Sequence, residues 1–242
     1  MPDRPAGATD EGRPKPVPFS QYKAEQARIS RKRLYPLTAF YSCYATAVLA
    51  LGLLSEHPLV ALAFYTAGIP VWTLIEYLFH RFVLHGRFPE REGRIGRFLH
   101  DRLDPLHWEH HERPFDGLHI SGELRDFLPV FLIAAPASFL LPVYTAPAIV
   151  AGIFQCYVIE EWIHHSVHFY NFRNRYFRYI KRFHRYHHSQ AGMDLGFGLT
   201  SGLWDVVLGT RYPPPIRRAL FGSRWEWTDT GVRPRDPHGQ NT

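Results

Sequence analysis

Four short stretches carry eleven of the fifteen histidines of this chain: EYLFHRFVLH at 76–85, LHWEHHERPFDG at 106–117, EEWIHHSVHFY at 160–170 and FHRYHHSQAG at 183–192. All of these histidines except His165 follow the spacings HxxxxH, HxxHH, HxxxH and HxxHH. Positions i, i+3 and i+4 share one face of a helix, so we expect each HxxHH to direct three imidazoles toward one point. The ten candidate metal ligands are His80, His85, His107, His110, His111, His164, His168, His184, His187 and His188.

The HxxxxH pair fits a regular helix less well, because five residues rotate by about 140° at 3.6 residues per turn. We therefore expect the helix to distort or end between His80 and His85. Imidazole suits zinc, copper, iron and nickel, and ten imidazoles are too many for one ion, so the clusters predict two metals with about five histidines each. The other histidines are predicted to lie outside the site: His57, His100, His119, His165 and His238.

Carboxylates stand about one helical turn before several of these histidines. Glu76 precedes His80 by four residues, and Glu160 and Glu161 precede His164 by four and three. A metal-binding imidazole commonly donates its second N–H to such a partner, which fixes its tautomer. We predict this role for three glutamates and for one aspartate in GLWDVVLGT: Glu76, Glu160, Glu161 and Asp205. The alternative is that the glutamates are solvated carboxylates at the ends of helices.

The distribution of positive charge indicates a membrane protein. All 28 Lys and Arg residues fall in 1–33, 81–125 and 173–235, and none lies in 34–80 or 126–172. Such segregation is typical of a multi-pass protein whose positive loops face the cytoplasm. The net charge of +6 does not indicate a nucleic-acid partner, because no known binding motif accompanies the basic segments.

Apolar stretches predict four membrane spans, at 37–54, 59–79, 127–143 and 148–163. The fold expected is therefore an all-α integral membrane protein with two helical hairpins. The turns between paired spans lack Lys and Arg, which places them outside the cytoplasm and brings all the histidine clusters to the cytoplasmic surface. The third and fourth spans are short, and the third contains three prolines, so a re-entrant or strongly tilted pair is the alternative.

The number of nitrogen ligands indicates oxygen chemistry rather than hydrolysis. A hydrolytic zinc site typically keeps three protein ligands and one open position, and this chain offers more nitrogen and lacks an HExxH motif. Two adjacent iron ions in an all-histidine shell fit O2 activation and attack on an unactivated C–H bond. The spans lead directly to the histidines, which favours a lipid substrate that enters from the bilayer.

The four spacings, in this order, resemble the fatty acid hydroxylase/sterol desaturase superfamily. PFDG at 114–117 and GFGLTSGLWDVVLGT at 196–210 are similar to its fatty acid 2-hydroxylase branch, and the resemblance covers residues 70–212. It implies four transmembrane helices with a cytosolic helical cap, and metal ligation by the ten histidines. It also implies hydroxylation at carbon 2 of a long acyl chain, free or within a sphingolipid. The corresponding organisation is a disordered basic segment at 1–33, a membrane hydroxylase domain at 34–212 and a C-terminal tail at 213–242.

Two departures from this branch affect the expected partners. Many members carry an N-terminal cytochrome b5 domain, for which residues 1–36 are too short, so we expect electrons from a separate protein of cytochrome b5 or ferredoxin type. The segment LHISGELRDFLPV at 118–130 replaces a different family segment at the expected substrate entrance.

Other assignments stay open. A sterol or carotenoid oxygenase of the superfamily, or a membrane metal carrier or sensor, is the alternative function. Zinc binds such a site more tightly than Fe(II) and can replace iron during isolation. Arg outnumbers Lys 24 to 4, which favours a bacterial inner membrane with a cytoplasmic metal site, or the ER membrane in a eukaryote.

Overall fold

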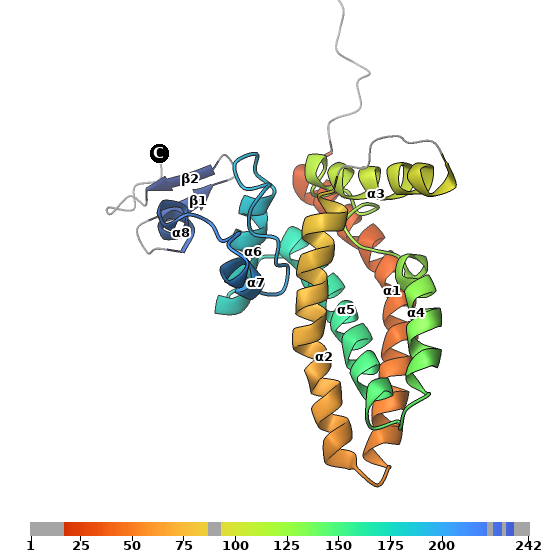
Figure 1. The fold of residues 1–242 in the computed structure, drawn as a ribbon. Coiled ribbons are helices and arrows are strands. Elements are labelled where there is room, and N and C mark those ends of the chain that lie inside the picture. Colours follow the sequence, from red (N-terminus) through yellow and green to blue (C-terminus); the bar gives the residue numbers. More distant parts are fainter. Residues whose placement is uncertain (1–16, 87–92, 222–224, 229–230, 235–242) are drawn as a thin grey trace, which may run out of the picture.

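A bundle of four helices forms the body of the molecule. The other elements lie around the upper half of this bundle in Figure 1. The structure is a computed structural model and describes residues 17–86, 93–221, 225–228 and 231–234. The bundle consists of α1 (Phe19–Leu53), α2 (Pro58–Phe79), α4 (Leu124–Ser138) and α5 (Ala146–Phe169). The surrounding elements are η1 (His80–Leu84), α3 (Arg94–Glu112), α6 (Arg175–His187), α7 (Leu203–Val207), α8 (Pro214–Phe221), β1 (Trp225–Thr228) and β2 (Gly231–Pro234).

Among the described helices, three are long and apolar enough to cross a membrane: α1, α5, and α2 together with η1. They contain the predicted spans 37–54, 59–79 and 148–163. The stretch predicted as the third span, 127–143, is helical only as far as Ser138. The 15 residues of α4 extend about 22 Å, which is less than the ~30 Å hydrocarbon core. Four full spans are therefore not confirmed.

The helix α1 begins well before the apolar stretch. The prediction of a disordered segment at 1–33 is wrong for residues 19–33, while residues 1–16 lie outside the described residues. Buried positions recur every three or four residues from Ala27 through Ser30 and Leu34 to Gly52. This buried stripe packs one helix face against the bundle, and it stabilises a segment whose composition alone indicates disorder.

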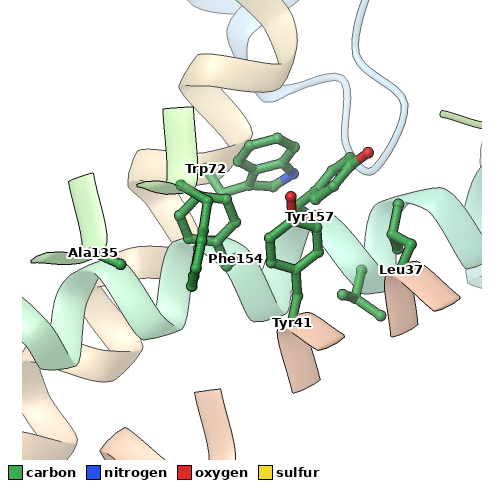
Figure 2. Close-up of a cluster of buried hydrophobic side chains, with 8 residues drawn as sticks. Leu37, Tyr41, Trp72, Ala135, Phe154 and Tyr157 are labelled. Atoms are coloured by element: carbon green, nitrogen blue, oxygen red, sulfur yellow. The ribbon is translucent and has the colours of Figure 1, made fainter. Parts of the chain in front are cut away.

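Aromatic side chains fill the space between the four bundle helices (Figure 2). Tyr41 of α1 stacks on Phe154 of α5 with ring centroids 4.9 Å apart. Trp72 of α2 packs against Tyr157 of α5 at 5.1 Å. Such pairs contribute beyond the area that they bury, because their rings are offset or tilted. They fix the relative positions of α1, α2 and α5, the helices that lead to the histidines.

Two glycines allow α2 and α5 to approach closely. A Cβ atom added to Gly68 lies 2.7 Å from the backbone of Gly152, and one added to Gly152 lies 2.0 Å from the carbonyl oxygen of Tyr65. Small residues at such crossings permit backbone contact between membrane helices. The approach holds the ends of α2 and α5 at a fixed separation.

The predicted distortion between His80 and His85 is confirmed. α2 continues into a single π turn, η1, in which the N–H of His85 donates to the carbonyl of His80 at 3.0 Å. A π turn places residues i and i+5 above one another, and the two imidazole centroids lie 5.0 Å apart. The irregular HxxxxH spacing thus becomes a pair on one side of the helix.

The C-terminal segment departs from the all-α prediction. The tail predicted at 213–242 contains α8 and an antiparallel hairpin in which Trp225 pairs with Pro234 and Thr228 with Gly231. The two short strands are rich in aromatic and β-branched residues, which favour extended backbone. All other regular elements of the described residues are helical.

Candidate metal centre

The ten predicted histidines come together in two groups of five. In each group, one nitrogen per histidine lies within 4.8 Å of the corresponding nitrogen of every other member. We call the groups site A and site B. Site A consists of His80, His85, His107, His111 and His187. Site B consists of His110, His164, His168, His184 and His188.

The two HxxHH motifs divide their histidines between the sites, which corrects the expectation that each motif serves one point. In α3, His107 and His111 belong to site A and His110 to site B. In α6 the assignment is reversed, because the 184/188 pair belongs to site B and His187 to site A. A residue turns the helix by about 100°, so positions i and i+4 nearly coincide while i+3 lies to the other side.

The two sites therefore receive their histidines in the same pattern, as two pairs and one single residue. Site A receives a pair from α2 and η1, a pair from α3 and a single histidine from α6. Site B receives a pair from α5, a pair from α6 and a single histidine from α3. Each of α3 and α6 thus contributes to both sites, and the sites are held together by two shared helices.

The nitrogen spacing fits coordination of a cation. The Nε2 atom of His107 lies 2.9–3.1 Å from those of His80, His85 and His111. An imidazole nitrogen carries at most one proton, so three such contacts cannot all be hydrogen bonds. With metal–nitrogen distances of about 2.1 Å, ligands at right angles are about 3.0 Å apart and tetrahedral ligands about 3.4 Å. The observed spacing matches the right-angled arrangement.

Site B shows the same spacing around His184. Its Nε2 atom lies 3.1 Å from that of His164, 2.8 Å from that of His168 and 3.0 Å from that of His188. Four neutral lone pairs directed at one point repel each other unless a positive charge lies between them. The donor set therefore fits a metal ion in each site.

Burial keeps the imidazoles in the form that binds metal. Burial, reinforced by the neighbouring His187, lowers the pKa of His85 to about 3. Burial also lowers the pKa of His187 to about 4. It lowers the pKa of His107 and His184 well below the usual range, again with a contribution from adjacent imidazoles. A neutral imidazole binds a metal without first releasing a proton.

Glu76 holds a loop rather than an imidazole, which corrects its predicted direct contact with His80. Its carboxylate accepts the backbone N–H of Leu199 and of Thr200, the latter at 2.9 Å, and the hydroxyl of Thr200 at 2.6 Å. The carboxylate is thus saturated by the loop that follows α6. The long separation in sequence, from α2 to this loop, hides the partner from inspection of the motif alone.

Asp205 holds the same loop from its other end. Its carboxylate accepts the N–H of Phe197 at 2.9 Å and of Gly198 at 3.0 Å. The carbonyl of Phe197 in turn accepts a hydrogen bond from Nδ1 of His80. The loop carbonyl therefore occupies the place predicted for a carboxylate, and Asp205 and Glu76 position it.

The other two glutamates are also not bonded to imidazole. Glu161 accepts the backbone N–H of Gly122 at 3.1 Å. Glu160 lies in the wall of a cavity beside the histidines. Their exposed fractions are 7% and 6%, so solvation at a helix end is excluded for both. Instead of the predicted contact with His164, Glu161 contacts a loop and Glu160 lies in the cavity wall.

Four of the histidines predicted to lie outside the site are described, and none belongs to either group. His165 is buried and its Nδ1 lies 2.8 Å from the hydroxyl of Ser30. His119 lies beside Asp116 and Glu109. The other two are His57, in the turn before α2, and His100, in α3. His238 lies outside the described residues.

A mainly apolar cavity of about 480 Å³ reaches both sites. Its wall includes His80 and His107 of site A and His110 and His164 of site B. The wall also contains the three predicted glutamates, and the segment 118–130 expected at the substrate entrance supplies several more of its residues. The main additional lining residues are Trp72, Phe79, Leu84, Ser121, Arg125 and Phe127.

Comparison with known proteins identifies the family of this chain. The profile of a family described as fatty acid hydroxylase matches residues 62–210, more than half of the chain. Dihydroceramide fatty acyl 2-hydroxylase FAH2 of Arabidopsis thaliana is 34% identical over 153 residues, which cover 59% of this chain and 58% of the relative. Ceramide very long chain fatty acid hydroxylase SCS7 of Saccharomyces cerevisiae is 33% identical over 172 residues, covering 69% and 42%.

A mammalian relative and a solved structure agree with this placement. Fatty acid 2-hydroxylase of Rattus norvegicus is 30% identical over 160 residues, which cover 64% of this chain and 41% of the relative. The solved structure of full-length Scs7p, in which only the hydroxylase domain is visible, is similar with a TM-score of 0.65 and 30% identity, covering 75% of this chain and 67% of that chain. The matched region thus spans about two fifths to three fifths of these curated relatives. The chain belongs to the fatty acid hydroxylase family.

Proposed function

We propose that this chain hydroxylates a long acyl chain of a membrane lipid at carbon 2, with two iron ions held in sites A and B. The observation that carries the proposal is the apolar cavity, whose wall contains histidines of both sites. The mainly apolar wall of this cavity suits the acyl chain of a sphingolipid or of a free fatty acid. The similarity to a dihydroceramide fatty acyl 2-hydroxylase and to a ceramide very long chain fatty acid hydroxylase supports the same substrate class.

The overall reaction is R–H + O2 + 2 e⁻ + 2 H⁺ → R–OH + H2O. Iron bound by the histidines supplies the reduction of O2 and an oxidant strong enough for an unactivated C–H bond. The two electrons come from a separate electron-transfer protein of cytochrome b5 or ferredoxin type. Zinc in isolated protein is compatible with this proposal, because it binds nitrogen sites more tightly than Fe(II).

The chain's own residues position the acyl chain and exclude water. Trp72, Phe79 and Phe127 give the cavity apolar walls on which an acyl chain replaces water contacts. Glu160 and the exposed Arg125 provide polar groups in the same wall. A carboxyl or amide group held at such a polar position leaves carbon 2 as the first methylene to face the histidines.

The proposed membrane arrangement follows from charge and helix length. α1, α2 and α5 cross the bilayer, and the shorter α4 packs beside α5 as part of the second hairpin, with residues 34–212 as the functional unit. The remaining helices form a cap on the cytoplasmic side. All ten histidines and both termini face the same side. In a bacterium this places the protein in the inner membrane, and in a eukaryote in the ER membrane.

Lipid analysis under labelled oxygen tests the proposed function. The protein is expressed with a reductase system in a host that lacks 2-hydroxylated lipids. Label at carbon 2 that disappears in His187→Ala is expected. A new double bond, or a hydroxyl on a sterol or carotenoid ring, would instead assign the chain to a related branch. Exchangeable metal without any oxidised lipid would indicate a carrier or sensor.

A further inference from the structure

The helix α6 presents two kinds of side chain on opposite faces. Its buried face carries Ile180, Phe183, His184 and His187. At about 100° per residue its other face is cationic, and the helix contains no Asp or Glu. The cations of this face are Arg175, Arg178, Lys181, Arg182 and Arg185.

The arginine charge at the N-terminal end of this face has no acidic partner among the described residues. Within the part of the chain that the structure describes, Arg28 pairs with Glu25, and Arg113 pairs with Glu109. No carboxylate among the same residues forms an ion pair with Arg175 or Arg178, and both are exposed. The N-terminal part of the cationic face of α6 therefore carries unpaired positive charge, and it is complementary to an acidic surface.

A hollow beside α6 extends the cationic face. It lies between α6 and α8, has a volume of about 370 Å³, and is lined by Arg211, Arg217 and Arg218 together with Tyr179 and Phe221. Nε of Arg217 is buried there without a hydrogen-bond partner among the described residues. A planar guanidinium next to an aromatic wall binds a carboxylate side chain well. The hollow is therefore suited to receive an Asp or Glu of a partner.

The composition of α6 favours a protein partner over a lipid surface. Its exposed large hydrophobic residues are Tyr176 and Tyr179, and aliphatic side chains are missing from that set. A helix that lies on a membrane presents Trp, Phe or Leu anchors beside its cations, and no exposed anchor of these types is present on α6. The nearby α7 has that character, with exposed Leu203, Val206 and Val207. Arg and Tyr are instead enriched at protein–protein interfaces.

We propose that α6 and the α6–α8 hollow form the docking surface for an acidic electron-transfer protein. The inference rests on the proposed function, which needs two electrons in each turnover. His184 contributes to site B and His187 to site A, both from the buried face of α6. A partner seated on the cationic face lies one helix diameter, about 10–12 Å, from both sites.

Direct binding tests the proposal without turnover. The full chain is reconstituted in phosphatidylcholine nanodiscs, and its affinity for the soluble domain of cytochrome b5 is measured by calorimetry at low and high salt. The variant Arg175→Glu/Arg178→Glu/Arg218→Glu is expected to bind about tenfold or more weakly and to lose most of the salt dependence. The control Arg28→Glu/Lys32→Glu/Arg97→Glu changes the charge equally on other surfaces, and its affinity is expected to stay within about twofold of wild type.

Unchanged cytochrome b5 affinity in the α6–α8 variant would overturn the docking surface. If that variant also loses the stabilisation that phosphatidylglycerol gives the wild-type protein, the face is assigned to lipid instead. Circular dichroism and metal content verify that the variant is folded. Cytochrome b5 binding without any hydroxylated lipid would overturn the proposed function alone.

Discussion

His80 donates from Nδ1 to the carbonyl of Phe197, a residue 117 positions later in the chain. A carbonyl only accepts, so this bond fixes the tautomer of His80 and leaves its Nε2 lone pair for a metal. Nε2 of the same ring lies 3.1 Å from Nε2 of His107. The orientation of this histidine in site A therefore depends on the loop that Glu76 and Asp205 hold.

Replacing Glu76 by Gln is expected to weaken metal binding at site A. The amide nitrogen cannot accept the hydrogen bond from the Thr200 hydroxyl, and the neutral amide oxygen is a weaker acceptor for the N–H groups of Leu199 and Thr200. The loop that carries the Phe197 carbonyl is therefore held less firmly. Loss of such an orienting partner typically lowers metal affinity or activity about 10–100-fold. Chelator competition measures the affinity, and Glu56→Gln, at an exposed position, is the control. Equal affinity in both variants would show that the loop does not orient His80.

Removal of a histidine from either site is expected to lower the metal content. His110→Ala deletes a site B ligand and His187→Ala a site A ligand, and each variant should hold one ion per chain or fewer. His165→Ala is the control, because His165 is buried but bonded to Ser30 outside both groups. Elemental analysis of purified protein gives the ratio. Two ions per chain in His110→Ala would remove that residue from the ligand set.

Narrowing the cavity is expected to reduce turnover without loss of metal. Leu84 lines the cavity, so Leu84→Trp places a larger ring where the acyl chain is proposed to lie. One misfitting group in an apolar pocket typically costs about 10–200-fold in kcat/KM. Phe82→Trp, on an exposed neighbouring position, is the matched control. Wild-type kinetics for long acyl chains in Leu84→Trp would place the substrate elsewhere.

Adding a methyl group at Gly152 is expected to destabilise the bundle. The new Cβ meets the Tyr65 carbonyl oxygen at 2.0 Å, so α2 and α5 must separate. Overpacking of this kind costs about 1–3 kcal/mol or more. Thermal unfolding in detergent compares Gly152→Ala with Ala63→Val, which enlarges an exposed position of α2. A melting temperature as high as that of the control would show that the two helices can adjust at no cost.

The gathering of the ten histidines could be predicted from the sequence because histidine spacing on one helix is a local property. The irregular pair His80 and His85 was also interpretable, since only a distorted helix brings such residues together. The division of the ten histidines between sites A and B could not be predicted. It depends on how α3 and α6 face each other, and i+3 and i+4 differ only in the side of the helix to which they turn.

The bonding partners of the orienting carboxylates could not be predicted either, for a related reason. A carboxylate four residues before a histidine indicates a contact within the helix, but Glu76 bonds instead to Thr200 on a distant loop. Tertiary contacts likewise decide where α1 begins. Ala27 and Ser30 look unremarkable within a charged segment, yet both are buried against other elements. Composition predicts solvent exposure there, and close packing of small side chains overrides it.

The exchange of histidines between α3 and α6 has a consequence for metal loading. If each group binds an ion, the first ion would restrain both helices, because each supplies histidines to both sites. The second ion then meets ligands that have already lost their conformational freedom, which is the thermodynamic basis of positive cooperativity. Loading is therefore expected to be nearly all-or-none. A preparation that averages one ion per chain is then mostly a mixture of empty and doubly loaded molecules, and its activity should scale with the doubly loaded fraction.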